Sequence, residues 1–315
     1  MNKNNIKDYS RKISERMWNL PDKGELESHR EETFMDDIIQ KSHIERTLLE
    51  NLEGIDTVFD AGAGCGRFSI LLAKQGCHVT HFDISQPMID KAKELAERAG
   101  VMDRITFVKG ALEDLSEYPN RSFDMVISFD APISYTYPNQ EHIIGELVRI
   151  AKKRMIISVT SRLGSLPLLA NPIQKNQFLL NEHSEDPFVQ WCVSNRQNAI
   201  DTFHFNKSNI EQLMADGVMG GEYEIAEYEK GGAPWCITYA FMPNELEGLL
   251  RSFGVKNIEM AGPGAYARTI PHEILVKIMN DSKQRSDFLD VCYKFDSNPY
   301  VCGMGKDNLL AKGDL

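Results

Sequence analysis

The chain has 315 residues, 42% of them hydrophobic and 26% charged, which is enough to bury a substantial core. Acidic residues (46) outnumber basic ones (35), so the formal net charge is -11, and attraction to nucleic acid or an anionic membrane is not expected. No run of about 18 apolar residues predicts a membrane span, and the polar N-terminus lacks the apolar core of a signal peptide. These features predict a globular, cytoplasmic protein.

The spacing of cysteines and histidines argues against a metal site. The six cysteines form no C-x-x-C pair, and the eight histidines form no H-E-x-x-H arrangement. We therefore predict reduced, buried cysteines and no bound metal.

The first 50 residues have a helical, amphipathic pattern. Between residues 34 and 49, apolar side chains recur at steps of three to five residues, at Phe34, Ile38, Ile39, Ile44 and Leu48. This spacing predicts a helix that lies on the surface of a domain. We interpret residues 1–50 as a helical lid or brace.

From Thr57 to about Arg162, strand-like and helix-like segments alternate, which is typical of a parallel sheet with helices on both faces. The predicted strands are short and rich in β-branched or aromatic residues: 57–59, 78–82, 105–108, 124–128 and 155–159. Ser85 is the predicted cap of a helix that ends near Gly100.

The alternation stops at residue 163 and resumes after 236. The intervening residues, 163–236, have short helical fragments and an acidic stretch at 221–229, and we interpret them as an inserted cap subdomain. The pattern then predicts a helix over 243–253, a strand over 255–260, a long helix over 271–295 and a last strand over 308–312. Residues 51–162 and 237–315 together form the predicted core.

The most informative motif lies between the first predicted strand and the following helix. Gly62, Gly64 and Gly66 alternate with other residues after Asp60, so the backbone can turn sharply and approach a ligand at a helix N-terminus. The third glycine of the dinucleotide fingerprint G-x-G-x-x-G would fall at position 67, where this chain has Arg67. A nicotinamide or flavin cofactor is therefore disfavoured. The turn predicts a nucleoside-type cofactor.

A second anchor stands at the end of the second predicted strand. Asp83 lies seventeen residues after Gly66. Because this strand neighbours the first one in such sheets, the carboxylate can accept hydrogen bonds from both hydroxyls of a ribose.

With these features the sequence resembles the class I S-adenosylmethionine-dependent methyltransferases, closely over residues 57–160 and loosely over 239–260. The resemblance implies a Rossmann-like, doubly wound α/β sheet of about seven strands, mostly parallel with the last strand antiparallel. The inserted helical cap and the N-terminal helical segment add to this core. S-adenosylmethionine is the implied cofactor.

The resemblance also implies which residues hold the cofactor. Asp60, Gly62, Gly64 and Gly66 would surround its methionine end, and Asp83 would bind its ribose. The adenine would lie near Ile84, Met88, Leu112 and Glu113. The run from Ser128 to Pro132, which includes Phe129, matches the place where the methyl group meets its acceptor.

Methyl transfer from a sulfonium is an in-line displacement, which depends mainly on alignment in a dry pocket. Where an acceptor must lose a proton, the candidate bases near the pocket are Asp130, Tyr135 and His142, with Tyr137 and His204 as further possibilities.

The leading hypothesis is methylation of a small-molecule acceptor, with the insertion and the N-terminal segment as a cover over the acceptor site. Methylation of RNA or protein and a non-catalytic cofactor-binding module are the alternatives. A nucleobase amino-group methylase is disfavoured, because Asp130–Ile133 lacks the first proline and the aromatic residue of that signature. The oligomeric state is not predicted.

Overall fold

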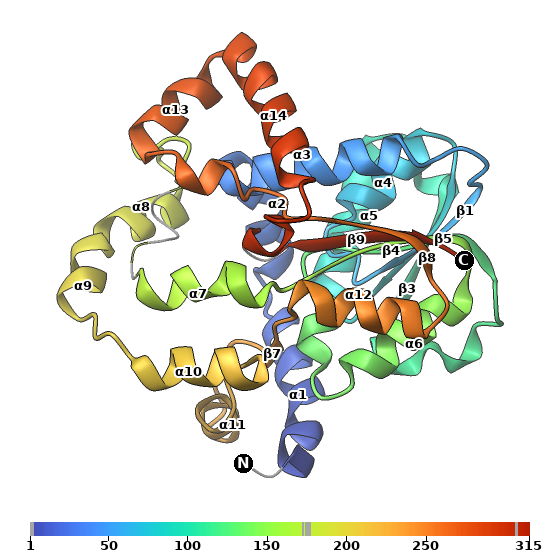
Figure 1. The fold of residues 1–315 in the computed structure, drawn as a ribbon, viewed down its shortest axis with the longest axis horizontal. Coiled ribbons are helices and arrows are strands. Elements are labelled where there is room, and N and C mark those ends of the chain that lie inside the picture. Colours follow the sequence, from blue (N-terminus) through green and yellow to red (C-terminus); the bar gives the residue numbers. More distant parts are fainter. Residues whose placement is uncertain (1–2, 172, 174–177, 306–307) are drawn as a thin grey trace.

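The computed structural model describes residues 3–171, 173, 178–305 and 308–315 (Figure 1). Residues 1–2, 172, 174–177 and 306–307, which belong to the predicted N-terminal segment, insertion and core, lie outside the described residues.

A twisted sheet forms the centre of the described chain. Its seven strands have the order β3-β2-β1-β4-β5-β9-β8. Their bounds are β1 (Thr57–Ala61), β2 (His78–Asp83), β3 (Ile105–Lys109), β4 (Phe123–Ser128), β5 (Ala151–Val159), β8 (Lys256–Ala261) and β9 (Leu309–Asp314). Strands β1 to β5 are parallel, and β9 runs antiparallel to both of its neighbours, β5 and β8. This confirms the predicted fold class.

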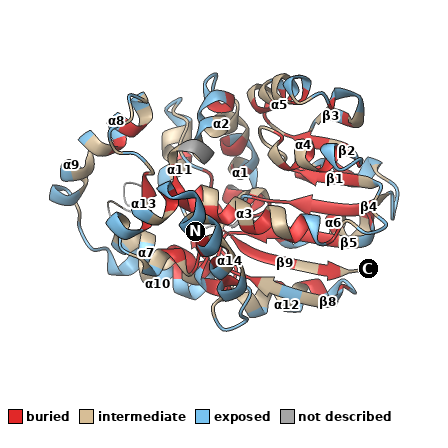
Figure 2. Cartoon of the chain, turned by 90° about the horizontal axis from the view of Figure 1, so that it is seen from above, coloured by how far each residue is buried: buried red, intermediate tan, exposed pale blue. Residues whose placement is uncertain are grey.

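Helices cover both faces of the sheet (Figures 1 and 2). One layer consists of α3 (Met35–Leu49), α4 (Arg67–Lys74) and α5 (Gln86–Arg98), and the other of α6 (Gln140–Ile150) and α12 (Pro243–Ser252). Successive strand residues point to opposite layers: Val58 packs in the first and Phe59 in the second. The strands are therefore almost continuously apolar, as expected for a sheet that is buried on both sides.

Two elements differ from the prediction by more than two residues. Strand β5 starts four residues before Met155, because Ala151 already pairs with Phe123 and the following lysines lie at the sheet end, where Lys153 contacts Asp124 at 2.9 Å. The predicted long helix over 271–295 is wrong. It is two helices, α13 (His272–Asn280) and α14 (Ser282–Asp296), since the extended Asp281 caps the second by accepting from the N–H groups of residues 283 and 284.

The N-terminal segment folds as α1 (Lys3–Trp18), α2 (Lys23–Thr33) and α3, which we call the lid. The residues between β5 and α12 form α7 (Arg162–Ala170), α8 (Pro187–Ser194), α9 (Arg196–Asp201), α10 (Lys207–Asp216), α11 (Glu222–Glu229) and a two-stranded sheet of β6 (Val218–Met219) and β7 (Thr238–Tyr239). Helices α8 to α10 project away from the main sheet (Figure 1).

Phe59 on β1 is a central element of the core. Its ring is fully buried, with centroids 5.0 to 5.3 Å from the rings of Phe82, Tyr118 and Phe123. We expect Phe59→Ala to lower the free energy of unfolding by about 3–5 kcal/mol, because it leaves a cavity. Denaturant titration measures this, with Trp191→Ala as control, since the Trp191 side chain is 57% exposed. Equal losses of unfolding free energy in Phe59→Ala and Trp191→Ala would contradict the central place of Phe59 in the core.

Candidate functional site

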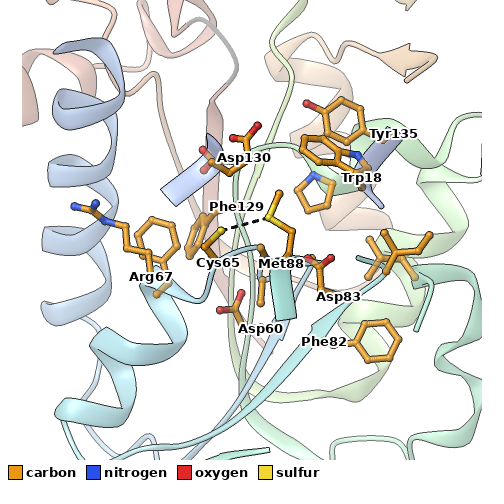
Figure 3. A pocket seen from close by; sticks show the side chains of 18 of the residues that line it. Trp18, Asp60, Cys65, Arg67, Phe82, Asp83, Met88, Phe129, Asp130 and Tyr135 are labelled. Carbon is orange, nitrogen blue, oxygen red and sulfur yellow. Dashed lines mark hydrogen bonds between the residues drawn. The ribbon is translucent and has the colours of Figure 1, made fainter. Parts of the chain in front are cut away.

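A cavity of about 440 Å³ lies at the carboxyl ends of β1, β2 and β4 (Figure 3). Its walls come from the lid helices and from the loops and helices that follow β1 to β4, and all lining residues fall between Arg11 and Thr136. This position is the one at which open α/β sheets bind ligands.

The glycine turn after β1 forms one wall. Gly62, Gly64 and Gly66 have φ values of 73°, 55° and 81°, which side chains rarely adopt. A Cβ atom at Gly62 would lie 2.5 Å from Pro132, whereas one at Gly64 would meet no atom within 4 Å. Gly66 is not among the lining residues; a Cβ there would lie 3.0 Å from the Cβ of Ala92, so this glycine allows α4 to pack closely on α5.

Asp83 ties the glycine turn to the end of β2. Its carboxylate is 7% exposed and accepts hydrogen bonds from the backbone N–H groups of Gly64 and Ser85, both at 2.8 Å. Burial raises the pKa of Asp83, although these N–H donors act in the opposite direction. A buried carboxylate thus faces the cavity at the position predicted for a ribose anchor.

Asp60 belongs to a buried polar chain beneath the turn. Ser69 donates to the Asp60 carboxylate at 2.6 Å, and the Ser69 Oγ lies 3.1 Å from His81 Nδ1. Because the single Ser69 proton points to Asp60, the hydrogen in the second contact comes from His81 Nδ1. Burial raises the pKa of Asp60 to about 7 and lowers the pKa of His81 to about 3.

Comparisons with known proteins agree with this geometry. Residues 58–154 match the family model of a methyltransferase domain. Among curated relatives, magnesium protoporphyrin IX methyltransferase of Arabidopsis thaliana is 29% identical over 52% of this chain and 56% of its own length. The tRNA 5-carboxymethoxyuridine methyltransferase of Escherichia coli is 37% identical over 22% of this chain and 27% of its own. This chain therefore spans only part of the length of these relatives.

Solved structures include 1,6-didemethyltoxoflavin-N1-methyltransferase of Burkholderia thailandensis, which is 15% identical, with a TM-score of 0.46 over 89% of this chain and 79% of that one. The strand order, the glycine turn and the family match together decide the classification. Residues 58–154 belong to the class I S-adenosylmethionine-dependent methyltransferases. S-adenosylmethionine is the cofactor of that family.

The methyltransferase domain has a cavity that suits this cofactor. Gly64 opens onto unfilled space, and buried Asp83 presents oxygen acceptors to the same space. Most of the predicted cofactor residues line the cavity: Asp60, Gly62, Gly64, Asp83, Ile84, Met88, Leu112, Glu113 and Phe129. Two lining side chains, Cys65 and Met88, are joined by a hydrogen bond from Cys65 Sγ to Met88 Sδ at 3.3 Å (Figure 3).

The candidate bases separate into two groups. Asp130 and Tyr135 line the cavity (Figure 3). His142 is exposed on α6, His204 is exposed between α9 and α10, and Tyr137 is buried against Tyr239, with ring centroids 5.8 Å apart. These three lie outside the lining, so their candidacy is not supported.

A charged roof covers the end of the cavity near Asp130, and of its residues the sequence analysis named only Asp130. We use this name for Glu27, Arg30, Asp37, Lys41 and Asp130. Arg30 contacts Asp37 at 3.1 Å and Glu27 at 2.8 Å, and Lys41 contacts Asp130 at 3.0 Å. Burial alone would raise the pKa of Asp130, but Lys41 and Arg30 hold it below its usual range. The charged pair Asp37 and Lys41, one helical turn apart, was visible in the sequence, but it did not show that Lys41 would contact Asp130.

The lid closes over the end of β2. Ser85 Oγ donates to the carbonyl of Trp18 at 2.6 Å, and Asn19 exchanges hydrogen bonds with Ile84 and Gln86. Helix α2 approaches α5 so closely that a Cβ at Gly24 would lie 2.5 Å from the Pro87 carbonyl oxygen. The lid is thus attached to the loop that carries Asp83.

The insertion does not supply the expected cover. None of its described residues lines the cavity, since the lid already occupies that edge. It contacts the lid instead: Arg16 donates to the carbonyls of Tyr228 at 2.7 Å and Gly232 at 3.1 Å, and its guanidinium lies 3.5 Å from the Tyr228 ring centroid. The insertion therefore braces α1.

Within the described residues, no helix has the length and apolarity needed to cross a membrane. The same part of the chain has no cluster of three or more His, Cys, Asp or Glu side chains suited to a metal.

The pKa of Asp60 predicts a pH dependence of stability. Its folded pKa of about 7 exceeds that of an unfolded aspartate, so the stability it contributes at low pH is lost as the pH rises to about 7. We expect Asp60→Asn to flatten the pH dependence of the unfolding free energy between about pH 4 and about pH 7. Urea unfolding at several pH values measures this. Asp296, whose pKa is raised by burial to about 6, is present in both proteins and affects both equally. Parallel curves of unfolding free energy against pH for the two proteins would contradict the prediction.

The Arg16 contacts predict that the insertion holds α1 closed. In Arg16→Gln, loss of the charged hydrogen bonds should speed amide exchange over residues 6–18 about tenfold or more. Mass spectrometry measures this exchange. Arg251→Gln is the matched control, since Arg251 pairs with Glu247 on the exposed surface of α12. Equal rates in wild type and Arg16→Gln would show that the insertion does not brace the lid.

Proposed function

We propose that this protein transfers a methyl group from S-adenosylmethionine to a small-molecule acceptor inside the cavity under the lid. The observation that carries the proposal is that the glycine turn, the buried Asp83 and residues of the charged roof line the same cavity. A cofactor at the turn and an acceptor beneath the roof would share one enclosed space.

We assign the cofactor contacts by position. Asp60, Gly62 and Gly64 surround the methionine end, and Asp83 accepts from the ribose hydroxyls. We assign the adenine to Ile84, Met88, Leu112 and Glu113, which all line the cavity. Gly66 acts indirectly, by allowing α4 to pack on α5.

The bound cofactor supplies an electrophilic methyl group on a positively charged sulfur. The chain aligns the acceptor with that group and excludes water through the lid. We assign the binding of the acceptor's reacting group to Asp130 and Tyr135, which line the cavity. The lowered pKa of Asp130 keeps it ionised, so it orients a donor better than it removes a proton.

The enclosure favours a small acceptor over RNA or protein. The lid helices and the net charge of -11 both oppose entry of a polyanion. The named relatives include enzymes of both kinds, acting on magnesium protoporphyrin and on tRNA. The cytoplasmic location expected from composition stays a prediction.

The test of activity supplies labelled S-adenosylmethionine with three acceptor pools: a metabolite extract, bulk tRNA and a protein extract. The proposal expects label in the small-molecule fraction. Label found only in tRNA or protein would show that the acceptor is RNA or protein instead. Cofactor binding without transfer to any pool would indicate a non-catalytic module.

The proposed ribose contact predicts a loss of affinity in Asp83→Ala. Hydrogen bonds to a charged acceptor contribute roughly 1.5–3 kcal/mol each, so S-adenosylhomocysteine should bind about tenfold to several hundredfold more weakly. Calorimetry measures the affinity, and Asp90→Ala, which removes an exposed carboxylate on neighbouring α5, is the control. Unchanged affinity in folded Asp83→Ala protein would remove Asp83 from the site.

A further inference from the structure

Many of the residues that line the cavity are polar. Among them are hydroxyl and charged side chains, Ser14, Glu27, Ser28, Arg30, Lys41, Asp130, Tyr135 and Thr136, beside apolar ones such as Trp18, Phe129 and Pro132. Ser28 and Thr136 donate to the carbonyls of Glu25 and Ile133, and Arg30 and Lys41 are in ion pairs, so these groups do not by themselves exclude an apolar acceptor. Because the same 440 Å³ must also hold the cofactor, a bulky acceptor is disfavoured.

Asp130 is presented to this space by a strained backbone. Asp130 and Ala131 have φ values of 62° and 66°, a region that non-glycine residues occupy at a cost of about 1–3 kcal/mol each. The Asp130 side chain is 44% exposed, whereas its neighbours Phe129 and Ala131 are 4% and 0% exposed. Lys41 and Asn308 donate to the carboxylate. A carboxylate has about four acceptor positions, so Asp130 can accept a further donor.

The neighbouring cations are held in ion pairs. Arg30 binds Asp37 and Glu27, Lys41 binds Asp130, and Arg67 binds Glu45 at 2.9 Å. An anionic acceptor would have to break one of these pairs in a partly dehydrated site. A donating acceptor can use the positions on Asp130 that Lys41 and Asn308 leave open, so no ion pair has to break.

Two aromatic side chains, Trp18 and Tyr135, lie next to each other in the lining (Figure 3). Their ring centroids are 5.8 Å apart. Lys23 Nζ lies 4.9 Å from the Trp18 centroid and 5.6 Å from that of Trp235, so this cluster already accommodates a cation. Carboxylate and rings together favour a nitrogen base.

We propose that the acceptor is a small amine whose nitrogen donates a hydrogen bond to Asp130. This inference rests on the proposed function and specifies its substrate class. The amine gives up any excess proton to solvent, and its lone pair then forms the N–C bond to the methyl carbon. The C–S bond breaks with its electron pair on sulfur, and the product nitrogen is a cation that can release a second proton to water.

The test uses three ligands of similar shape that differ in charge: 2-phenylethylamine, 2-phenylethanol and 3-phenylpropionate. Calorimetry measures their binding to the full chain saturated with S-adenosylhomocysteine. We expect the amine to bind about tenfold or more tightly than the alcohol, and the carboxylate to bind most weakly. In Asp130→Asn, amine affinity should fall about tenfold to a hundredfold while the alcohol changes less than about threefold.

Asp290→Asn is the matched control, because Asp290 is an exposed carboxylate on α14 outside the cavity, and it should change none of the three affinities. With S-adenosylhomocysteine bound normally, the inference is overturned by preference for the carboxylate, by equal or no binding of the three ligands, or by an unchanged amine affinity in Asp130→Asn. If wild-type protein does not bind S-adenosylhomocysteine, the proposed function fails first and this inference with it.

Discussion

The hydrogen bond from the Gly64 N–H to the Asp83 carboxylate is the interaction on which the site depends. It joins the ends of two adjacent parallel strands at the point where the chain turns into α4. Because Asp83 also accepts from Ser85, it fixes the loop that in turn binds the carbonyl of Trp18 and so anchors the lid. A single buried carboxylate thus organises the turn, the β2 loop and the cover, and its burial makes each of these hydrogen bonds costly to lose.

From this constraint the roles of the surrounding segments follow. The lid supplies side chains to the cavity, whereas the insertion contacts α1 through Tyr228 and Gly232 and packs Trp235 against Trp18. The insertion therefore influences the site by stabilising the closed lid. In the charged roof, carboxylates pair with the cations Arg30 and Lys41. Asp130, whose backbone is strained, faces the cavity.

The sequence predicted those features that local patterns determine. The five parallel strands, the glycine turn and Asp83 have short-range signatures, and the structure places the latter two at one cavity. Contacts between distant segments were missed. The approach of Gly24 to Pro87 and the pairing of Lys41 with Asp130 depend on how the lid docks, which helical periodicity does not encode. His142 was a candidate by chain position, but α6 directs it to solvent. The break at Asp281 was overlooked because an apolar stripe continues on both sides of this capping residue.

The central claim is that the cofactor binds between the glycine turn and the lid and that the insertion contributes no wall of that site. Amide exchange of the full chain with and without saturating S-adenosylhomocysteine tests it most directly. The account predicts protection over residues 61–66, 82–88 and 110–114 and over the lid at residues 14–30, with little change over α8 to α10. Protection concentrated in α8 to α10, with the glycine turn and lid unaffected, would contradict it.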